Sequence, residues 1–204
     1  GASAIKDRIT EIGIVLVDEN GIREWSQLVH PQARIPAYIE QMTGITNAMV
    51  EQAPKFAEVA DEVEAMLQGR LFIAHNARFD YGFLKNEFNR LGMTFRPTVL
   101  CTVKLSRALY PQYRHHNLDS LMERHNLITK DRHRALADAQ LIHQFWHVLL
   151  EKFSESELND TIRQLINRSS LPSHIDPLLI HELPEGPGVY LFYGKNDLPL
   201  YIGK

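Results

Sequence analysis

The sequence predicts an α/β domain whose sheet contains strands of mixed direction, and three observations lead to this prediction. Two alternating apolar segments flank Glu19, Asn20 and Gly21, which are typical residues of a tight hairpin turn. Short apolar segments then alternate with longer segments of helical periodicity, the pattern of strands joined by helical crossovers. The 204 residues are enough for one sizeable domain and part of another.

In the first half of the chain we expect strands at residues 10–17 and 23–30, paired antiparallel as the hairpin. Prolines end this hairpin. Apolar residues at helical spacing predict a helix over residues 56–67, and Gly69 is a suitable residue to end it.

In the second half, short strands are expected at residues 71–74 and 99–102. The helix after the first of these places Phe79 and Leu91 on its inward face and stops at Gly92. Further helices are expected at residues 103–109, 117–125, 133–150 and 156–168.

The C-terminal part differs in composition. Residues 169–187 contain four prolines and little periodicity, which is typical of a linker, and a hairpin signal follows at residues 189–202. We therefore expect three parts: a domain at 1–150, a helix and linker at 151–187, and the start of a second domain at 188–204. Because the first residue is Gly1 and the last residues follow a strand pattern, we expect a fragment of a longer protein.

Composition and charge exclude several classes of protein. The chain is 44% apolar and 23% charged, which is typical of a soluble globular protein. No apolar segment reaches the ~18–20 residues that a bilayer span requires. Cys101 is the single cysteine, so we expect a reducing, cytoplasmic setting. The net charge of −3 excludes an overall basic DNA binder but leaves local positive charge open.

Asp80 is the first candidate for chemistry. It follows the strand at residues 71–74 by about one helical turn, near the sheet edge where open α/β folds bind ligands. A carboxylate there can bind a metal ion, or it can simply complement the positive end of the helix dipole.

His133 and Asp138 stand at the start of a predicted helix. Five residues apart, they are rotated by about 140° around a helix axis, so they share a face only if His133 lies just outside the helix. In that position His133 can lean over a site that Asp138 lines. The alternative is that His133 caps the helix and Asp138 is solvated.

Six segments in this order resemble the DEDDh family of 3′→5′ exonucleases, the group that includes the proofreading epsilon subunit of DNA polymerase III. The segments are residues 8–13, 43–46, 75–80, 105–111, 117–121 and 133–139, so the resemblance covers residues 1 to about 150. It implies a ribonuclease-H-like mixed sheet flanked by helices, and a bacterial enzyme that releases nucleoside monophosphates from DNA 3′ ends.

The resemblance also implies roles for individual residues. Asp80 and Asp138 would bind two divalent metal ions, Mg²⁺ or Mn²⁺, and His133 would be the general base, for which the pKa of histidine is suitable. Glu11 would be a supporting acid. Contacts to the 3′-terminal nucleotide would come from Thr43, Gly44, Ile45, Asn76 and Phe79, with a core position for Phe79 and support of Asp80 by Asn76 as alternatives.

The sequence departs from this family at its first motif. The family carries Asp-x-Glu on its first strand, which supplies two of four carboxylates, and no Asp-x-Glu occurs in these 204 residues. Two carboxylates can hardly hold two Mg²⁺ ions, which demand near-ideal coordination geometry. We therefore expect the chain to start just after this motif and to be inactive or nearly so.

The C-terminal hairpin carries a second resemblance. Residues 187–190 followed by 200–204 resemble the opening of a GIY-YIG nuclease domain, as in excision-repair incision nucleases. This makes Tyr190 and Tyr201 candidate site residues of an incomplete domain. The alternative is an ordinary aromatic hairpin, although a two-stranded hairpin by itself is only marginally stable.

Local charge favours a nucleic-acid partner. Residues 104–116 contain three Lys or Arg, two His and two Tyr but no acid, a composition suited to a single strand. We expect DNA with a single-stranded 3′ end as substrate, DNA polymerase subunits as further partners, and a role in replication proofreading or repair. Two alternatives stay open: a catalytically dead module that binds nucleic acid or a polymerase, and an RNA-directed exonuclease of the same family.

Overall fold

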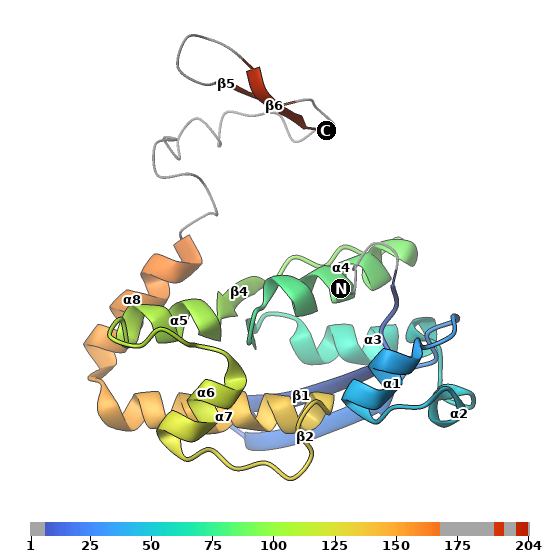
Figure 1. Ribbon diagram of the computed structural model, residues 1–204, viewed down its shortest axis with the longest axis horizontal. Helices are drawn as coiled ribbons and strands as arrows, with labels where there is room; N and C mark the ends of the chain where they lie inside the picture. Colours follow the sequence, from blue (N-terminus) through green and yellow to red (C-terminus); the bar gives the residue numbers. More distant parts are fainter. Residues whose placement is uncertain (1–6, 168–189, 194–198, 204) are drawn as a thin grey trace. The chain divides into compact units, whose positions relative to one another are not determined.

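The computed structural model describes residues 7–167, 190–193 and 199–203 (Figure 1). By its internal contacts the chain divides into two compact units, Gly1–Asn167 and Arg168–Lys204. The described part of the first unit contains strands β1–β4 and helices α1–α8, and that of the second contains β5 and β6.

The opening hairpin forms as predicted. Strand β1 (Glu11–Asp18) pairs antiparallel with β2 (Gly21–Leu28), from Glu11 opposite Leu28 to Asp18 opposite Gly21. Gly21 follows the turn with a φ of 109°, a conformation that only glycine adopts readily.

The second strand pair is parallel. Strands β3 (Leu71–Ala74) and β4 (Thr98–Cys101) pair with each other, and helix α4 (Arg78–Arg90) lies in the crossover between them. Our expectation of one continuous mixed sheet is wrong for the described residues, because β1–β2 and β3–β4 form separate two-stranded sheets. Periodicity predicts which segments are strands, whereas pairing between distant strands depends on tertiary packing.

The longer helices begin and end within two residues of the expected positions. They are α3 (Phe56–Leu67), α5 (Thr102–Leu109), α6 (Leu118–His125), α7 (Ala135–Lys152) and α8 (Glu155–Asn167). Two short helices, α1 (Ala37–Thr43) and α2 (Asn47–Val50), were not predicted, because neither is long enough to show a clear apolar period. In Figure 1, α7 runs along the β1–β2 hairpin.

Two large apolar clusters stabilise the first unit. One packs β1 against α3 and α4, with the rings of Phe56 and Phe88 in an edge-to-face contact at 5.1 Å. The other packs β4 against α5, α6, α7 and α8, and its central side chains are almost fully buried: Leu100, Leu105, Leu121, Leu141, Phe145 and Leu149. Full burial of such a side chain contributes about 1.5–3 kcal/mol.

Phe79 and Leu91 correct one expectation, since we placed both on the inward face of α4. They are 49% and 40% exposed. Phe79 lies in the first turn of α4 and Leu91 follows its last residue, so both flank the middle of the helix, where Phe83, Leu84 and Phe88 reach the core.

In the second unit, β5 (Tyr190–Tyr193) and β6 (Pro199–Gly203) form the predicted antiparallel hairpin. Tyr190 pairs with Gly203, and Tyr201 pairs with Phe192. The predicted linker at residues 169–187 lies outside the described residues. In the part of the chain that the structure describes, no helix combines the length and the apolar character needed to cross a membrane.

Candidate active site

Asp80 and Asp138 come from the first turns of two different helices, α4 and α7. The charge of Asp138 helps to raise the pKa of Asp80, so the two carboxylates are close enough to repel each other. His133 lies outside α7, which begins at Ala135, and its backbone N–H donates to Asp138 Oδ1 at 3.4 Å. Asp138 therefore acts on the charge of Asp80 and lies beside the backbone of His133, and the condition that His133 stand outside the helix is met. The Nδ1 atom of the His133 ring lies 3.4 Å from Arg132 Nη1.

The environment of Asp80 favours its protonated form. Burial raises the pKa of this carboxyl to about 6, its own backbone N–H acts in the opposite direction, and the negative charge of Asp138 raises the pKa further. The residue as a whole is nevertheless exposed to solvent. A carboxyl that gains or loses a proton near neutral pH is typical of a functional site.

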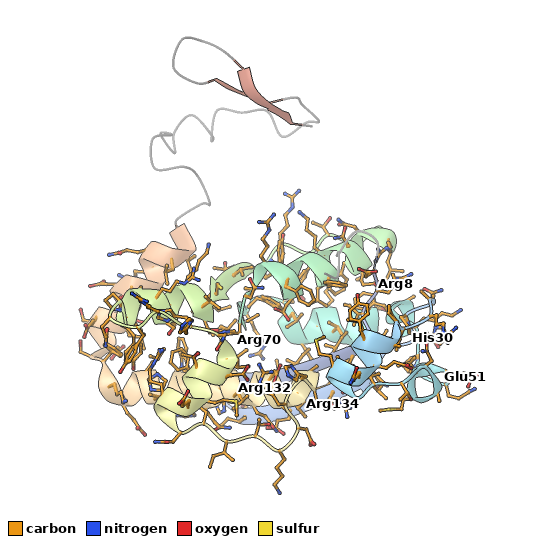
Figure 2. The ribbon with its side chains drawn as sticks, in the orientation of Figure 1. Arg8, His30, Glu51, Arg70, Arg132 and Arg134 are labelled. Carbon is orange, nitrogen blue, oxygen red and sulfur yellow. The ribbon has the colours of Figure 1, made fainter. Side chains whose placement is uncertain are left out.

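Arg132 binds the carboxylate of Asp138. Its Nη1 donates to both Oδ1 and Oδ2 of Asp138 at 2.6 Å, and its Nε donates to Asp119 Oδ1, in the first turn of α6, at 2.8 Å. Figure 2 shows Arg132 near the start of α7, close to Arg134. One guanidinium therefore connects the first turns of two helices. Nothing in the sequence pattern distinguishes Arg132 from the other basic residues around it.

Helix α7 is fixed directly to strand β1. Glu11 Oε2 accepts the Ala135 backbone N–H at 2.8 Å, and Glu11 Oε1 accepts Arg134 Nη2 at 2.6 Å. Two residues along β1, a Cβ added to Gly13 would lie 2.1 Å from the backbone N of Leu136, so strand and helix backbones touch. Glu11 thus caps the helix that carries Asp138, which agrees with the supporting role expected for it.

His75 directly follows the last residue of β3, Ala74, and was not predicted as an individual site residue. Its Nδ1 lies 2.9 Å from Thr102 Oγ1. Burial lowers the pKa of His75, so the ring is neutral at neutral pH, and the charges of Arg132 and Asp138 act on it in opposite directions. The signal that could have identified it is its position directly after a buried strand.

The predicted nucleotide-binding turn is a packed structure of its own. Thr43 Oγ1 donates to Ile39 O at 2.8 Å and accepts the Ile45 N–H at 3.2 Å, and Gly44 adopts a φ of 71°. Ile45 is only 2% exposed and packs with Ile35 and Val50.

Asn76 and Phe79 lie nearer to Asp80. Asn76 is exposed, has a φ of 65°, and accepts the Phe79 N–H with its backbone oxygen at 2.9 Å where the chain enters α4. The exposed ring of Phe79 lies 4.7 Å from the ring of Phe83. Phe79 is therefore available at the surface for an apolar contact, and it is not a core residue.

The donor set does not fit two divalent ions. Among the described residues no group of three or more His, Cys, Asp and Glu side chains is placed to hold a metal ion. Asp80 and Asp138 supply two carboxylates, and both oxygens of Asp138 are engaged by Arg132. A pair of divalent ions needs a larger set of oxygen ligands.

Comparison with known proteins identifies the family. A sequence model of the exonuclease family RNase_T matches residues 1–146. The chain belongs to this exonuclease family. The expectation of a nuclease of the DEDDh type is thereby confirmed at the level of the family.

Three bacterial relatives of this exonuclease domain illustrate the family. The 3'-5' exonuclease DinG of Bacillus subtilis is 38% identical over 161 residues, which are 78% of this chain and 17% of that protein. DNA polymerase III PolC-type of Caldanaerobacter subterraneus is 32% identical over 209 residues, 98% of this chain and 15% of that protein. The "Putative bifunctional exonuclease/endonuclease protein MT2247" of Mycobacterium tuberculosis is 36% identical over 209 residues, 97% of this chain and 32% of that protein. The chain thus spans a third or less of the length of these relatives.

Solved structures show the same fold. Exonuclease X in complex with 5' overhanging duplex DNA matches with a TM-score of 0.61 and 24% identity, over 78% of this chain and 93% of that one. A 3'-exonuclease solved with a histone mRNA stem-loop matches with a TM-score of 0.60 and 15% identity, over 72% and 79%. These likenesses show that the exonuclease domain shares the α/β fold of these solved exonucleases.

Proposed function

We propose that this exonuclease domain removes nucleoside monophosphates from the 3′ end of DNA. The observation that carries the proposal is the meeting of Asp80, Asp138 and His133 at the first turns of α4 and α7, in the order of the DEDDh motifs. The relatives named 3'-5' exonuclease support this direction of cleavage. A DNA duplex is bound to one structural neighbour, which supports DNA as the substrate class.

Within this proposal His133 takes the proton of the attacking water, because its imidazole is exposed to solvent and its backbone N–H lies 3.4 Å from Asp138 Oδ1. Asp80 and Asp138 belong to a site for two divalent ions, Mg²⁺ or Mn²⁺, that further carboxylates must complete, as an Asp-x-Glu pair would. The 3′-terminal nucleotide contacts Thr43 and Gly44 through backbone and hydroxyl groups. Asn76 and Phe79, which are both exposed, contact the same nucleotide, whereas Ile45 is 2% exposed and supports this turn from the apolar core instead of contacting the nucleotide as the resemblance implied.

A consequence is that this chain by itself is inactive or nearly so. One observation favours the second candidate, a module that binds nucleic acid or a polymerase without cleaving DNA. Arg132 donates two 2.6 Å hydrogen bonds to Asp138, so the charge of this carboxylate is balanced by a side chain of the protein. The polymerase as a partner is supported by the PolC-type relative, which matches 98% of this chain.

The second unit extends the proposal. We propose that residues 188–204 begin a GIY-YIG nuclease domain in which Tyr190 and Tyr201 are site residues, joined by residues 151–187 to a domain at 1–150. The observed antiparallel hairpin of β5 and β6 supports this, as does the relative named as a bifunctional exonuclease and endonuclease. Replication proofreading or repair in the bacterial cytoplasm is the proposed setting.

The test compares this chain with the full-length natural protein on single-stranded DNA labelled at its 5′ end, in Mg²⁺, Mn²⁺ or EDTA. A metal-dependent ladder that shortens from the 3′ end, made by the full-length protein alone, is the expected result. His133→Ala and Asp138→Ala should each abolish most of the cleavage, whereas Asp160→Ala, an exposed carboxylate on α8, should not. Intact DNA in every lane with retained DNA binding would favour the binding module, and faster cleavage of RNA would replace DNA as the substrate.

A further inference from the structure

Tyr110 and Tyr113, which lie between α5 and α6, differ in how far their side chains are exposed to solvent. Tyr110 is 8% exposed and belongs to the apolar cluster around α6 and α7. Tyr113 is 44% exposed and lies at the surface. Only Tyr113 can therefore offer its ring to a ligand.

Arg124 stacks on this exposed ring. The guanidinium carbon lies 3.7 Å from the centre of the Tyr113 ring, and Nη2 of Arg124 donates to the backbone oxygen of His115 at 2.6 Å. The guanidinium is thus fixed against the tyrosine, whose side chain nevertheless stays 44% exposed. Arginine and tyrosine planes are the surfaces on which nucleic-acid bases stack.

The segment that carries Tyr113 is rigidly held. His116 is 6% exposed, its Nδ1 lies 2.8 Å from Ser106 Oγ in α5, and its Nε2 lies 2.9 Å from the backbone oxygen of Tyr113. The Tyr113 N–H donates to the oxygen of Tyr110 at 3.2 Å. Because both backbone groups of Tyr113 are fixed, binding a ligand costs little ordering entropy.

The charge around this position suits a polyanion. Residues 104–125 contain four Lys or Arg against two acids, in a chain whose net charge is −3. One of these acids, Asp119, is paired with Arg132. Cationic side chains that face solvent here are Lys104, Arg107 and Arg114, with His115 beside them.

Helix α6 connects this surface to the candidate active site. Its first turn contains Asp119, which binds Arg132 and through it Asp138. Arg124 follows Asp119 by five residues on the same helix, a rise of about 7–8 Å along the axis.

We propose that Tyr113 and Arg124 form a stacking platform for a base of a single nucleic-acid strand whose 3′ end lies at Asp80 and Asp138. The inference rests on the proposed function for the position of the 3′ end. It assigns the platform to nucleotides upstream of the terminal one. It predicts a contribution to binding that appears only when the strand is long enough to reach the platform and that does not depend on cleavage.

The test measures fluorescence anisotropy of labelled oligonucleotides of about 12 nucleotides, and of a dinucleotide, in EDTA so that no cleavage occurs. Tyr113→Ala and Arg124→Gln should each weaken binding of the longer DNA strand about tenfold and leave dinucleotide binding unchanged. Tyr113→Trp should restore the affinity, because it keeps a stacking surface. Arg96→Gln, at an exposed arginine outside the platform, is the charge control.

Circular dichroism melting verifies that each variant is folded. Equal affinity of Tyr113→Ala and the unaltered chain for the longer strand overturns the platform, as does an equal loss for the dinucleotide. A matching loss on RNA supports the same stacking contact, since every base presents a flat face. If the full-length protein cleaves nothing but the length-dependent loss persists, the platform stands and the proposed exonuclease reaction fails.

Discussion

Arg132 donates two hydrogen bonds of 2.6 Å from a single nitrogen to the two carboxylate oxygens of Asp138. The same side chain holds Asp119 at 2.8 Å. Arg132 thus balances the charge of Asp138, which in turn acts on Asp80. The charges of Arg132, Asp138 and Asp80 are therefore coupled. Replacing Arg132 is expected to change the pKa of Asp80.

The first prediction concerns that coupling. Arg132→Gln removes the positive charge next to Asp138, so the negative charge of Asp138 should act on Asp80 more strongly and the pKa of Asp80 should rise above about 6. NMR titration of the Asp80 carboxyl measures this directly. Arg96→Gln should leave the titration unchanged, and an unaltered or lower pKa in Arg132→Gln would show that Arg132 does not control the site.

The second prediction follows from the raised pKa of Asp80. The folded state binds this proton more tightly than the unfolded state, so the contribution of Asp80 to stability falls as pH rises from about 4 to about 6. Asp80→Asn removes the ionisation and should raise the free energy of unfolding above pH 6 by about 1 kcal/mol, a value limited by the partial exposure of the group.

Urea unfolding at about pH 8 and about pH 4 tests the effect of Asp80→Asn, since the difference from the unaltered chain should vanish at the lower pH. Asp61→Asn, at an exposed position of α3, should have no effect at either pH. A stabilisation of the same size at both pH values would contradict the prediction.

The third prediction concerns the contact of β1 with α7. A Cβ on Gly13 would lie 2.1 Å from Leu136 N and 2.4 Å from the carbonyl carbon of Ala135, and backbone atoms cannot move aside independently. Gly13→Ala should therefore destabilise the domain by about 3 kcal/mol in urea unfolding.

Gly92→Ala is the matched control for Gly13→Ala. Nothing lies within 4 Å of a Cβ added at Gly92, so its φ of 73° is the only source of strain, worth about 1 kcal/mol. Equal losses of unfolding free energy in the two variants would contradict the close contact between the backbones of α7 and β1.

The fourth prediction concerns a buried carboxylate in α4. Glu87 is 2% exposed and binds Arg8 Nε at 2.6 Å and Nη2 at 2.8 Å, with Arg90 at 3.1 Å. Arg8→Met leaves this carboxylate with one cation and should cost about 3 kcal/mol of unfolding free energy. Adding Glu87→Leu should recover most of the loss.

The control for Arg8→Met is Arg23→Met. The side chain of Arg23 is 61% exposed and lies 3.1 Å from Asp18, so its loss should cost less than about 1 kcal/mol. If the two single variants were equally destabilised, burial of Glu87 would not be the cause.

Much of this domain could be predicted from local pattern. The hairpin at β1 and β2 and the range of α3 follow from periodicity and turn residues. The expected helix at residues 133–150 included His133, whereas α7 begins at Ala135, so helix geometry gave only the condition that His133 meets. Asp80 and Asp138 were identified as candidates in the same way.

What could not be predicted depends on contacts between distant segments. Arg132 binds Asp119 and Asp138 only because α6 and α7 begin close together, and nothing in the sequence distinguishes it from the arginines nearby. The separation of the strands into two sheets is likewise decided by tertiary packing. The exposure of Phe79 depends on where α4 begins, which periodicity alone does not give.

The bond between Glu11 and Arg134 joins positions 123 residues apart. Closing so long a loop loses chain entropy before any contact is gained, so such contacts form late in folding. On the ribosome, β1 emerges long before α7 has been made. Asp138 can therefore meet Asp80 only after nearly the whole domain has been synthesised, and an unfinished chain contains no assembled site that could act on nucleic acid.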